Sequence, residues 1–392
     1  MKKVLVPRVR FKGFGEEWKE ERIENIYSFA SEGGTPDTNK DIYYKPGLFY
    51  FTKIEDMANK YIYHTKAKIS ELGLKNSSAW IIPKNNILFS NVATIGNVSI
   101  NKVDLSTKQG IVGMIIKKKF NLEFIYYLLK SENFQSKVAE KITVGTIPTV
   151  AIFNLKKIEL FFSKNIYEQE KIGKLLENID NLISLEEIKF NKLKQLKETL
   201  LQKMFPEYNS KYPRIRFKGF EGEWKEEKLE YIAKVTNGKS NTSDNNKWGQ
   251  YNLYIRSEEI YKSNKYIFDV EGVITVGDGN IGKIFHYVNG KFDLHQRCYL
   301  IYEFQNIWPK YFYYYFSQNF YKRAILMSYT ATVNSIRMNT ITDMDIMFPK
   351  ELIEQQKIGD FFSKIDTLLD LYNSKLNKLK QIKEALLQKM FV

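Results

Sequence analysis

The sequence has little of the chemistry that most enzymes use. It contains one cysteine, Cys298, and three histidines in 392 residues. A single cysteine cannot form an internal disulfide, and no second cysteine offers the spacing of a zinc site. The histidines His64, His286 and His295 are too scattered to indicate a metal site or a catalytic triad. The expectation is a chain with no metal and no catalytic residues of its own.

Long apolar runs are missing too. No stretch reaches the roughly 18 apolar residues that a membrane-spanning helix needs. The N-terminal segment MKKVLVPRVRF is basic but lacks the apolar stretch of a signal peptide. Since a lone cysteine also fits a reducing compartment, we expect a soluble cytoplasmic protein.

Positive charge and aromatic residues, by contrast, are abundant. The 60 Lys and Arg outnumber the 45 Asp and Glu, which gives a net charge of +15. A field of this sign attracts polyanions, and nucleic acid is the first candidate. The alternative explanation is a compositional bias that over-uses Lys, Asn and Ile throughout the chain. The 26 Tyr and 27 Phe favour β structure, and the length favours two or three domains.

The sequence repeats itself, but only at its ends. PRVRFKGFGEEWKEERIENI at residues 7–26 matches PRIRFKGFEGEWKEEKLEYI at 213–232, a shift of 206 residues. Residues 168–205 match 354–391 at a shift of 186 residues, so the segment inside the first copy is about 20 residues longer. Between these ends the similarity fades to faint echoes, such as ATIGNVSI beside GNIGKIFH. The pattern indicates two copies of one scaffold whose middles have diverged.

The matched C-terminal segments predict two long helices. Each carries an apolar stripe of coiled-coil type, broken at Glu186 in the first copy, and neither has Pro or Gly within residues 174–205 or 360–392. We expect the two stripes to pack antiparallel against each other. The predicted seam consists of Ile172, Leu176, Ile179, Ile183, Leu193 and Leu200 in the first copy, and of Ile358, Phe362, Ile365, Leu369, Leu379 and Leu386 in the second.

The predicted fold class is therefore α+β. Two mixed α/β domains, residues 1–160 and 211–346, are separated by two helical segments, residues 161–210 and 347–392, in an antiparallel coiled coil with an approximate internal twofold repeat. Apolar residues outside the seam, Leu182, Leu185, Leu196 and Leu201, are candidates for a partner surface or for packing on the chain's own domains.

One glycine-rich segment partly matches the pattern of a phosphate-binding loop. GDGNIGKI at 277–284 has the G-x-x-x-x-G-K spacing of a phosphate-binding loop, but Ile284 stands where Ser or Thr should hold Mg²⁺. The residues that follow do not have a helical pattern, so the phosphates would lack a helix N-terminus. A tight turn between two strands explains the glycines better, and a P-loop hydrolase that uses Lys283 remains a second hypothesis.

Polar loops in the two middles are candidates for reading DNA bases. Arg, Lys, Asn, Gln, Ser and Thr are the side chains that reach base edges, although each such loop can equally be a solvated turn. The candidates in the first middle are Thr35, Asn39, Lys40, Lys53, Asn91, Thr94, Lys108 and Gln109. Those in the second middle are Lys239, Asn241, Arg256, Asn280, Lys283, His295, Gln296 and Arg297.

Taken together, the chain resembles the DNA specificity subunits of Type I restriction-modification systems. The resemblance covers nearly the whole chain. It is carried by the two RFKGF-x₂-EWKEE openings, the IGNV and IGKI strand-turn pieces, the EQEKIGKLL and EQQKIGDFF helix starts, and the NKLKQ-x-KE-x-LLQKMF helix ends. It implies two target recognition domains held apart by conserved helices.

That resemblance implies a non-catalytic subunit that recognises a bipartite, asymmetric target in double-stranded DNA. It also implies binding to two modification subunits that use S-adenosylmethionine, and in the full complex to restriction subunits that use ATP and Mg²⁺; this chain would carry no cofactor. A coiled-coil scaffold that binds only proteins, without DNA specificity, is the alternative.

Overall fold

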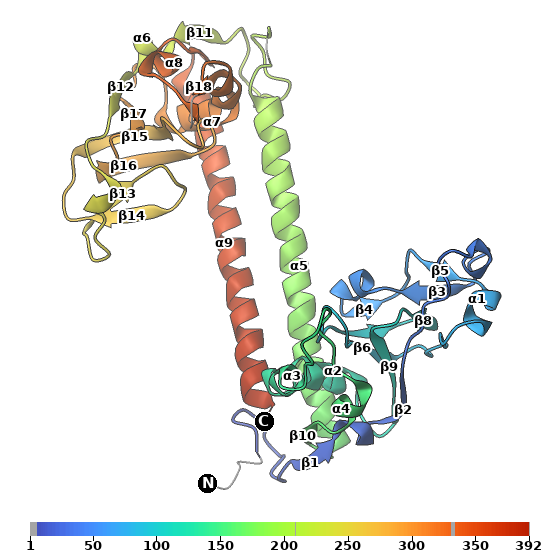
Figure 1. The fold of residues 1–392 in the computed structure, drawn as a ribbon. Helices are drawn as coiled ribbons and strands as arrows, with labels where there is room; N and C mark the ends of the chain where they lie inside the picture. The colour runs from blue at the N-terminus through green and yellow to red at the C-terminus, as the bar shows by residue number, and fades with distance from the viewer. Residues whose placement is uncertain (1–5, 208, 331–333, 392) are drawn as a thin grey trace. The chain divides into compact units, whose positions relative to one another are not determined.

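The structure, a computed structural model, describes residues 6–207, 209–330 and 334–391. The chain divides into two compact units: unit 1 comprises residues 1–186 and 375–392, and unit 2 comprises residues 187–374. Each boundary between the units falls inside a long helix. These helices are α5 (Ile166–Met204) and α9 (Leu352–Met390) (Figure 1). The predicted α+β class with two long helices is confirmed, and each unit contains the start of one long helix and the end of the other.

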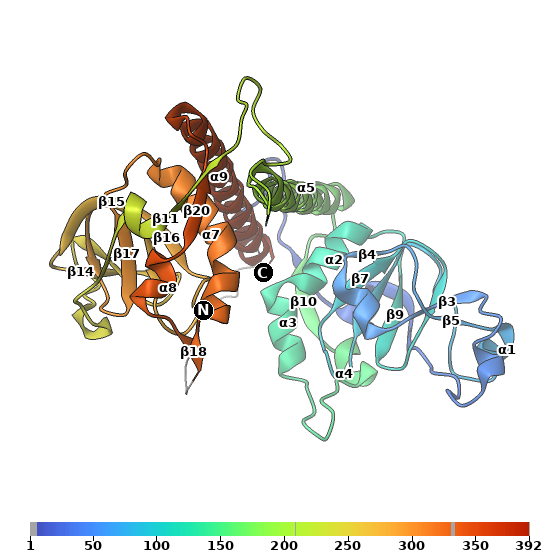
Figure 2. The same ribbon diagram turned by 90° about the horizontal axis from the view of Figure 1, so that it is seen from above.

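Unit 1 is built on a five-stranded sheet in the order β2-β9-β6-β7-β4. A smaller sheet, in the order β5-β3-β8, and helix α1 (Glu71–Lys75) lie on the side of the main sheet away from α5 (Figures 1 and 2). The strands of the two sheets are β2 (Tyr27–Glu32), β3 (Phe49–Thr52), β4 (Tyr61–Ile62), β5 (Lys68–Ile69), β6 (Asn86–Ser90), β7 (Val98–Asn101), β8 (Leu105–Thr107) and β9 (Ile111–Ile116). Pairing is antiparallel except for β4 with β7 and β3 with β8.

The remaining elements of unit 1 connect this sheet to α5. An antiparallel pair, β1 with β10, closes the base of the unit. The bounds are β1 (Lys19–Arg22), η1 (Ile23–Asn25), η2 (Asp41–Tyr43), η3 (Ile54–Ala58), α2 (Leu122–Lys130), α3 (Glu132–Ala139), α4 (Ile152–Lys156) and β10 (Glu159–Phe162). One face of α2, with Phe124, Ile125 and Leu128, packs with Ile87 and Phe89 of β6 in the main core.

Unit 2 has a six-stranded sheet in the order β12-β17-β15-β16-β13-β14. Its strands are β12 (Lys234–Asn237), β13 (Tyr251–Tyr254), β14 (Ile260–Ser263), β15 (Phe268–Val276), β16 (Phe285–Leu294) and β17 (Cys298–Tyr302). Around it lie β11 (Lys225–Lys228) paired with β20 (Asp345–Phe348), α6 (Leu229–Ile232), η4 (Thr242–Asp244), α7 (Pro309–Leu326), the short hairpin β18 (Tyr329–Thr330) with β19 (Asn334–Ser335), and α8 (Met338–Thr342). Aromatic residues of α7, among them Phe312 and Phe316, pack on Val273 and Ile301 of the sheet.

In each unit, a buried ion pair joins the repeated RFKGF segment to the first turn of a long helix. In unit 1, Nε and Nη2 of Arg10 donate to the two carboxylate oxygens of Glu168 at 2.5 and 2.9 Å. In unit 2, Nε and Nη2 of Arg216 donate to Glu354 at 2.7 and 2.8 Å. Both glutamate side chains are at most 2% exposed. The RFKGF and EQ-x-KIG motifs therefore recur together because the arginine of the first binds the glutamate of the second.

The glutamine that follows each of these glutamates anchors another helix. The Oε1 atom of Gln169 accepts from the backbone N–H of Asn121, the residue that caps α2, at 2.8 Å. The Oε1 atom of Gln355 accepts from Trp308, which caps α7, at 2.7 Å. Since a helix N-terminus leaves N–H groups without partners, these amides satisfy groups that would otherwise be buried unpaired.

A second repeated contact joins the two long helices within each unit. In unit 1, Asp180 of α5 accepts from the Tyr127 hydroxyl at 2.6 Å and pairs with Lys383 of α9 at 2.6 Å. In unit 2, Asp366 of α9 accepts from Tyr314 at 2.6 Å and pairs with Lys197 of α5. Residue numbers rise along one helix as they fall along the other, so the helices run antiparallel within each unit.

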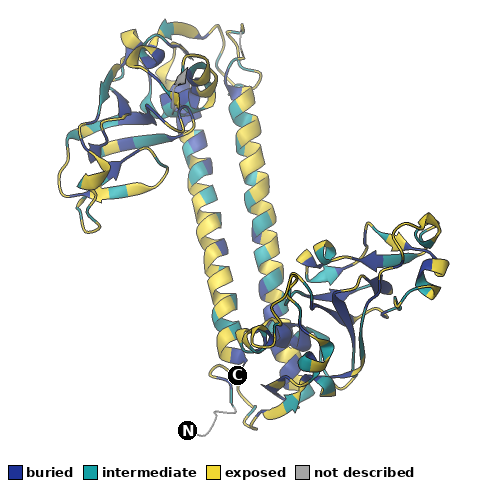
Figure 3. Cartoon of the chain, in the orientation of Figure 1, coloured by how far each residue is buried: buried dark blue, intermediate teal, exposed yellow. Residues whose placement is uncertain are grey.

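The predicted seam is only partly a contact between the two helices. Ile172 and Leu176 enter the core of unit 1, where Leu386 packs, and Ile358, Phe362 and Ile365 enter that of unit 2, with Leu193, Leu200 and Leu369 packed against it. Ile179 is buried, Ile183 and Leu379 are half-buried, and Glu186 at the break is buried and pairs with Lys375 at 3.0 Å. Figure 3 shows that the buried residues of α5 and α9 lie mainly near the helix ends, and that most residues of their middles are exposed. Residues of the two apolar stripes therefore pack into the globular cores as well as against the other long helix.

We expect Glu354→Ala to lower the free energy of unfolding of the full chain by about 3–5 kcal/mol, because it leaves a largely buried guanidinium without its carboxylate. The Arg216 side chain is only 16% exposed. Urea unfolding followed by circular dichroism measures the change.

The matched control for this substitution is Glu207→Ala. Glu207 also pairs with an arginine, Arg214, but the two side chains are 54% and 65% exposed. Exposed pairs contribute below about 1 kcal/mol, so this change should be small. Equal effects of the two substitutions would contradict the role given to Glu354.

Candidate nucleic-acid interface

The turn between β16 and β17 joins three other loops of unit 2. The backbone N–H of His295 donates to Tyr254 at the end of β13, at 2.9 Å. The N–H of Gln296 donates to Ser240 after β12 at 2.8 Å, and the carbonyl of Arg297 accepts from Gly277 after β15 at 2.8 Å. Four segments far apart in the sequence therefore meet at one place, and the candidate residues Asn241, Arg256 and Gln296 lie on them.

Side chains at this meeting point also bond one another. The amide of Gln296 donates to Oδ1 of Asn241 at 2.6 Å. Arg256 and Arg297 both donate through Nη1 to Asp278, at 3.0 and 2.9 Å. The side chains of the two arginines are 44% and 62% exposed, whereas that of Asp278 is 6% exposed. The result is an exposed polar surface with a buried carboxylate beneath it.

His295 and Cys298 face the interior beside this surface. His295 is 4% exposed, and its Nδ1 accepts from the backbone N–H of Arg297 at 3.1 Å. Burial, followed by the positive charge of Arg256, lowers the pKa of His295 below its usual value, so the ring is neutral at pH 7. Burial raises the pKa of the Cys298 thiol to about 12, with a smaller contribution from Asp278. Neither side chain presents a charge or a nucleophile to solvent.

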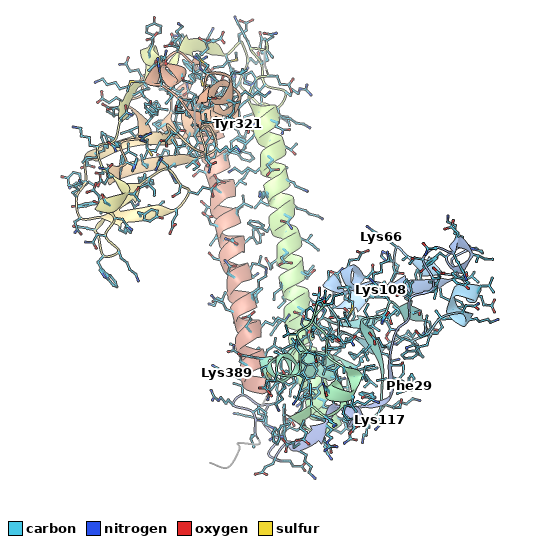
Figure 4. All side chains as sticks on the ribbon, viewed as in Figure 1. Phe29, Lys66, Lys108, Lys117, Tyr321 and Lys389 are labelled. Carbon is cyan, nitrogen blue, oxygen red and sulfur yellow. The ribbon has the colours of Figure 1, made fainter. Side chains whose placement is uncertain are left out.

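The same layout occurs in unit 1, with other residues. At the β8–β9 turn, Lys108 donates its N–H to Thr52 at the end of β3, at 2.9 Å, and Gln109 donates its N–H to Oγ1 of Thr35 at 3.3 Å. The carbonyl of Gly110 accepts from Asn91 after β6 at 3.0 Å, as Arg297 does from Gly277. The candidates Thr35, Lys53, Lys108 and Gln109 are thus brought together and exposed, and Figure 4 labels Lys108.

Other candidates of unit 1 lie apart from this meeting point or point inward. Asn91 is 2% exposed, and its amide nitrogen donates to the carbonyl of Val150 at 3.2 Å. Thr94 is exposed on the β6–β7 turn. Asn39 and Lys40 are exposed farther along their loop, where the Lys40 ammonium lies 5.3 Å from the ring centre of Tyr43. Within the described residues, no hydrogen bond or ion pair joins their side chains to the β8–β9 turn.

The glycine-rich segment of unit 2 is a turn between antiparallel strands. It connects β15 to β16, and Gly279 and Gly282 have φ angles of +76° and +65°, which favour glycine. No helix follows it, so a phosphate would lack a helix N-terminus, and the Lys283 ammonium lies 5.5 Å from the ring centre of Tyr321, labelled in Figure 4. Asn280 in this turn and Lys239 after β12 are exposed.

A short hairpin that was not predicted from the sequence pairs with the loop after β6 in unit 1 and with the loop after β15 in unit 2. In unit 1, Thr143 pairs with Thr149, and Thr149 also pairs with Val92; the apolar tip residues Val144 and Ile147 are 88% and 57% exposed. In unit 2, β18 and β19 form the matching hairpin, and Ser335 pairs with Asp278. The signal was present as GTIPT beside ATVNS at the 186-residue shift.

Among residues 6–207, 209–330 and 334–391, no group of three or more His, Cys, Asp or Glu is arranged to hold a metal ion. None of the helices in those ranges is long and apolar enough to cross a membrane.

Known proteins resemble this chain in sequence and fold. It is 32% identical over 171 residues to the MjaIX specificity subunit of Methanocaldococcus jannaschii, which covers 43% of this chain and 39% of that protein. It is 32% identical over 166 residues to the EcoDI specificity subunit of Escherichia coli, which covers 42% of this chain and 35% of that protein. These alignments thus span under two fifths of the curated relatives.

Solved structures match over a longer span but share only the fold. The S subunit of a Type I restriction-modification system from M. genitalium aligns with a TM-score of 0.70 at 16% identity, over 99% of both chains. A chain from a type I R-M system, solved to explain complex assembly and conformational transition, aligns at 0.54 and 16% identity, over 94% of this chain and 96% of that one.

The repeated architecture agrees with a family description that matches the chain twice. The description "Type I restriction modification DNA specificity domain" matches residues 15–195 and 221–381, one span for each copy of the scaffold. Because these two spans cover well over half of the chain, the protein belongs to the Type I restriction-modification DNA specificity family.

Proposed function

We propose that this chain recognises a split, asymmetric DNA sequence, with each unit reading one half, and does so without catalysing a reaction itself. The observation that carries the proposal is the matched meeting point of loops in the two units. Two matching backbone bonds hold the turn in each unit, but the turn presents Lys108 and Gln109 in unit 1 and Gln296 and Arg297 in unit 2. Two units with the same loop arrangement but different exposed side chains can recognise two different half-sites.

The chemistry of these surfaces fits duplex DNA. Gln, Asn and Arg can bond base edges in the major groove, while lysines contact phosphates. The exposed lysines Lys53, Lys108 and Lys239 lie beside the candidate base-reading side chains, and the whole chain carries +15. Phosphate contacts then place each unit on the duplex, and the other side chains select the sequence.

We further propose that the middles of the long helices bind two modification subunits. Leu182, Leu185 and Leu196 of α5 are 47%, 53% and 51% exposed, whereas Leu201 packs on the core of unit 2. α9 likewise exposes Leu368 and Leu371. In this proposal the modification subunits bind S-adenosylmethionine, restriction subunits bind ATP and Mg²⁺, and this chain needs no cofactor.

A protein-binding scaffold without DNA specificity is the second candidate, favoured by these same exposed leucines. The two proposals differ in salt dependence. Replacing counterions on several phosphates makes DNA affinity fall steeply as salt rises. Binding by apolar contacts alone would change little.

The first test is modified-base sequencing of DNA from cells that carry this gene together with a methyltransferase gene of the same system. We expect methylation at a split motif that is lost when this gene alone is deleted. Replacing residues 27–150 with another reading domain should alter one half of the motif and leave the other unchanged. If an active methyltransferase marks the same sites without this gene, the specificity role is wrong and the scaffold proposal takes its place.

A second prediction concerns the unread base pairs between the half-sites. α5 and α9 are each continuous over 39 residues. Inserting one heptad after Glu186 and another after Ser374 lengthens both helices by about 10 Å each and preserves the stripe. The number of unread base pairs should rise by about three, at 3.4 Å per base pair, while both half-sequences stay the same. A changed half-sequence in the methylated motif would contradict this role of the helices.

A further inference from the structure

Asp278 is a buried carboxylate shared by two exposed arginines. It sits at the start of the β15–β16 turn, is 4% exposed, and accepts from Nη1 of Arg256 and Nη1 of Arg297. A buried carboxylate needs charged partners to offset the loss of its hydration. Two guanidinium groups give the trio a net charge of +1, so the surface still attracts an anion.

The same chain shows what the unused edge of each arginine can bind. Arg10 and Arg216 use Nε and Nη2 to grip both oxygens of a glutamate. In Arg256 and Arg297 only Nη1 donates within the described residues, so this two-donor edge has no partner there. An exposed fork of two parallel N–H groups fits a planar partner with two adjacent acceptors.

We propose that Arg297, held in place by Asp278, reads a guanine in the half-site of unit 2, through Nε and Nη2 to guanine O6 and N7. This inference rests on the proposed function and identifies one base that unit 2 would recognise. Guanine offers O6 and N7 side by side in the major groove, and a bidentate arginine is the commonest specific contact to it. Arg297 is the more exposed of the two arginines, at 62% against 44%.

Asp278 acts here as a positioning residue. An arginine side chain has several rotatable bonds, and fixing it before DNA arrives lowers the entropy lost on binding. The carboxylate of Asp278 binds Nη1 of Arg297 and leaves Nε and Nη2 without a partner in the described part of the chain. Arg256, bonded through the same nitrogen to both carboxylate oxygens at 3.0 and 3.1 Å, neutralises the carboxylate, so that Asp278 does not repel DNA.

No equivalent of this trio occurs among the described residues of unit 1. The 186-residue shift places Val92 opposite Asp278, and the matching backbone bond places Gly110 opposite Arg297. The guanine assignment therefore concerns one half-site only. Phosphate oxygens also offer two acceptors to an arginine fork, and the experiment separates these two ligands.

The test is modified-base sequencing of cells that carry the methyltransferase gene with the wild-type gene or the Arg297→Gln variant. We expect one guanine in one half-site to lose its preference over other bases by about tenfold or more. The other half-site should be unchanged. Adenine should gain most at that position, because glutamine can bond adenine N6 and N7.

Asp278→Asn tests the positioning role. We expect a loss of preference at the same guanine, smaller than that of Arg297→Gln, and no further loss when the two changes are combined. Thermal unfolding of the assembled complex identifies a variant that merely fails to fold. A loss of fold would weaken methylation at every site alike, whereas mispositioning of Arg297 would change the base preference at one position of the motif only.

Arg214→Gln is the matched control, because Arg214 is 65% exposed and pairs with Glu207 away from the loops. It should leave the motif intact. A wild-type motif without a guanine that depends on Arg297, or a uniform fall in methylation in Arg297→Gln, would overturn the guanine assignment; the uniform fall points to a phosphate contact. A wild-type complex without any motif would overturn the proposed function as well.

Discussion

The core of each unit is completed by the end of a long helix that began in the other unit. Met390 and Phe391, at the end of α9, lie in the core of unit 1, and Phe391 contacts the ring of Trp18. Met204 and Phe205, at the end of α5, take the matching place in unit 2 against Trp224. Removing such buried aromatic side chains costs about 3–5 kcal/mol. The long helices are therefore part of both cores, and this explains why the sequence preserves the two ends of the repeat together.

This constraint leaves the reading loops open to change. The Arg–Glu ion pair, the glutamine that bonds the helix cap and the Tyr–Asp–Lys contact all involve residues of the long helices and none of the candidate loops. The backbone hydrogen bonds that join the loops do not depend on the side chains of residues 108 and 109 or 296 and 297. Side chains there can differ without weakening the scaffold. Divergent middles between conserved ends follow from this separation.

The sequence was sufficient for the features that depend on local spacing. The heptads of the α9 stripe and the missing Pro and Gly predicted both long helices, because helical periodicity is a property of neighbouring residues. The turn between β15 and β16 was also predicted from its glycines. Entry of Ile172 and Leu176 into a globular core was not, because it depends on contacts with α2 and the main sheet.

The candidate site was predictable in residue types but not in geometry. Polar runs indicated the loops, yet the burial of Asn91 and His295 depends on hydrogen bonds to Val150 and to the backbone of Arg297. Their contact with bases stays a prediction, as it does for the exposed candidates. Asp278 was not predicted as a site residue, because its segment has the spacing of a phosphate-binding loop. The sequence gives no local sign that Arg256 and Arg297, 41 residues apart, share its carboxylate.

The chain uses one kind of interaction for two purposes, and burial decides which. Where Arg10 meets Glu168, both edges of the pair are enclosed, and the side chains are 10% and 0% exposed. Such a pair fixes how the opening segment lies on the helix, since breaking it would leave a buried charge alone. Where Arg297 meets Asp278, the carboxylate side chain is 6% exposed and the arginine side chain is 62% exposed. Nη1 binds the carboxylate, and Nε and Nη2 have no partner among the described residues. The same chemistry stabilises when both partners are enclosed, and can recognise a ligand when one of them is left exposed.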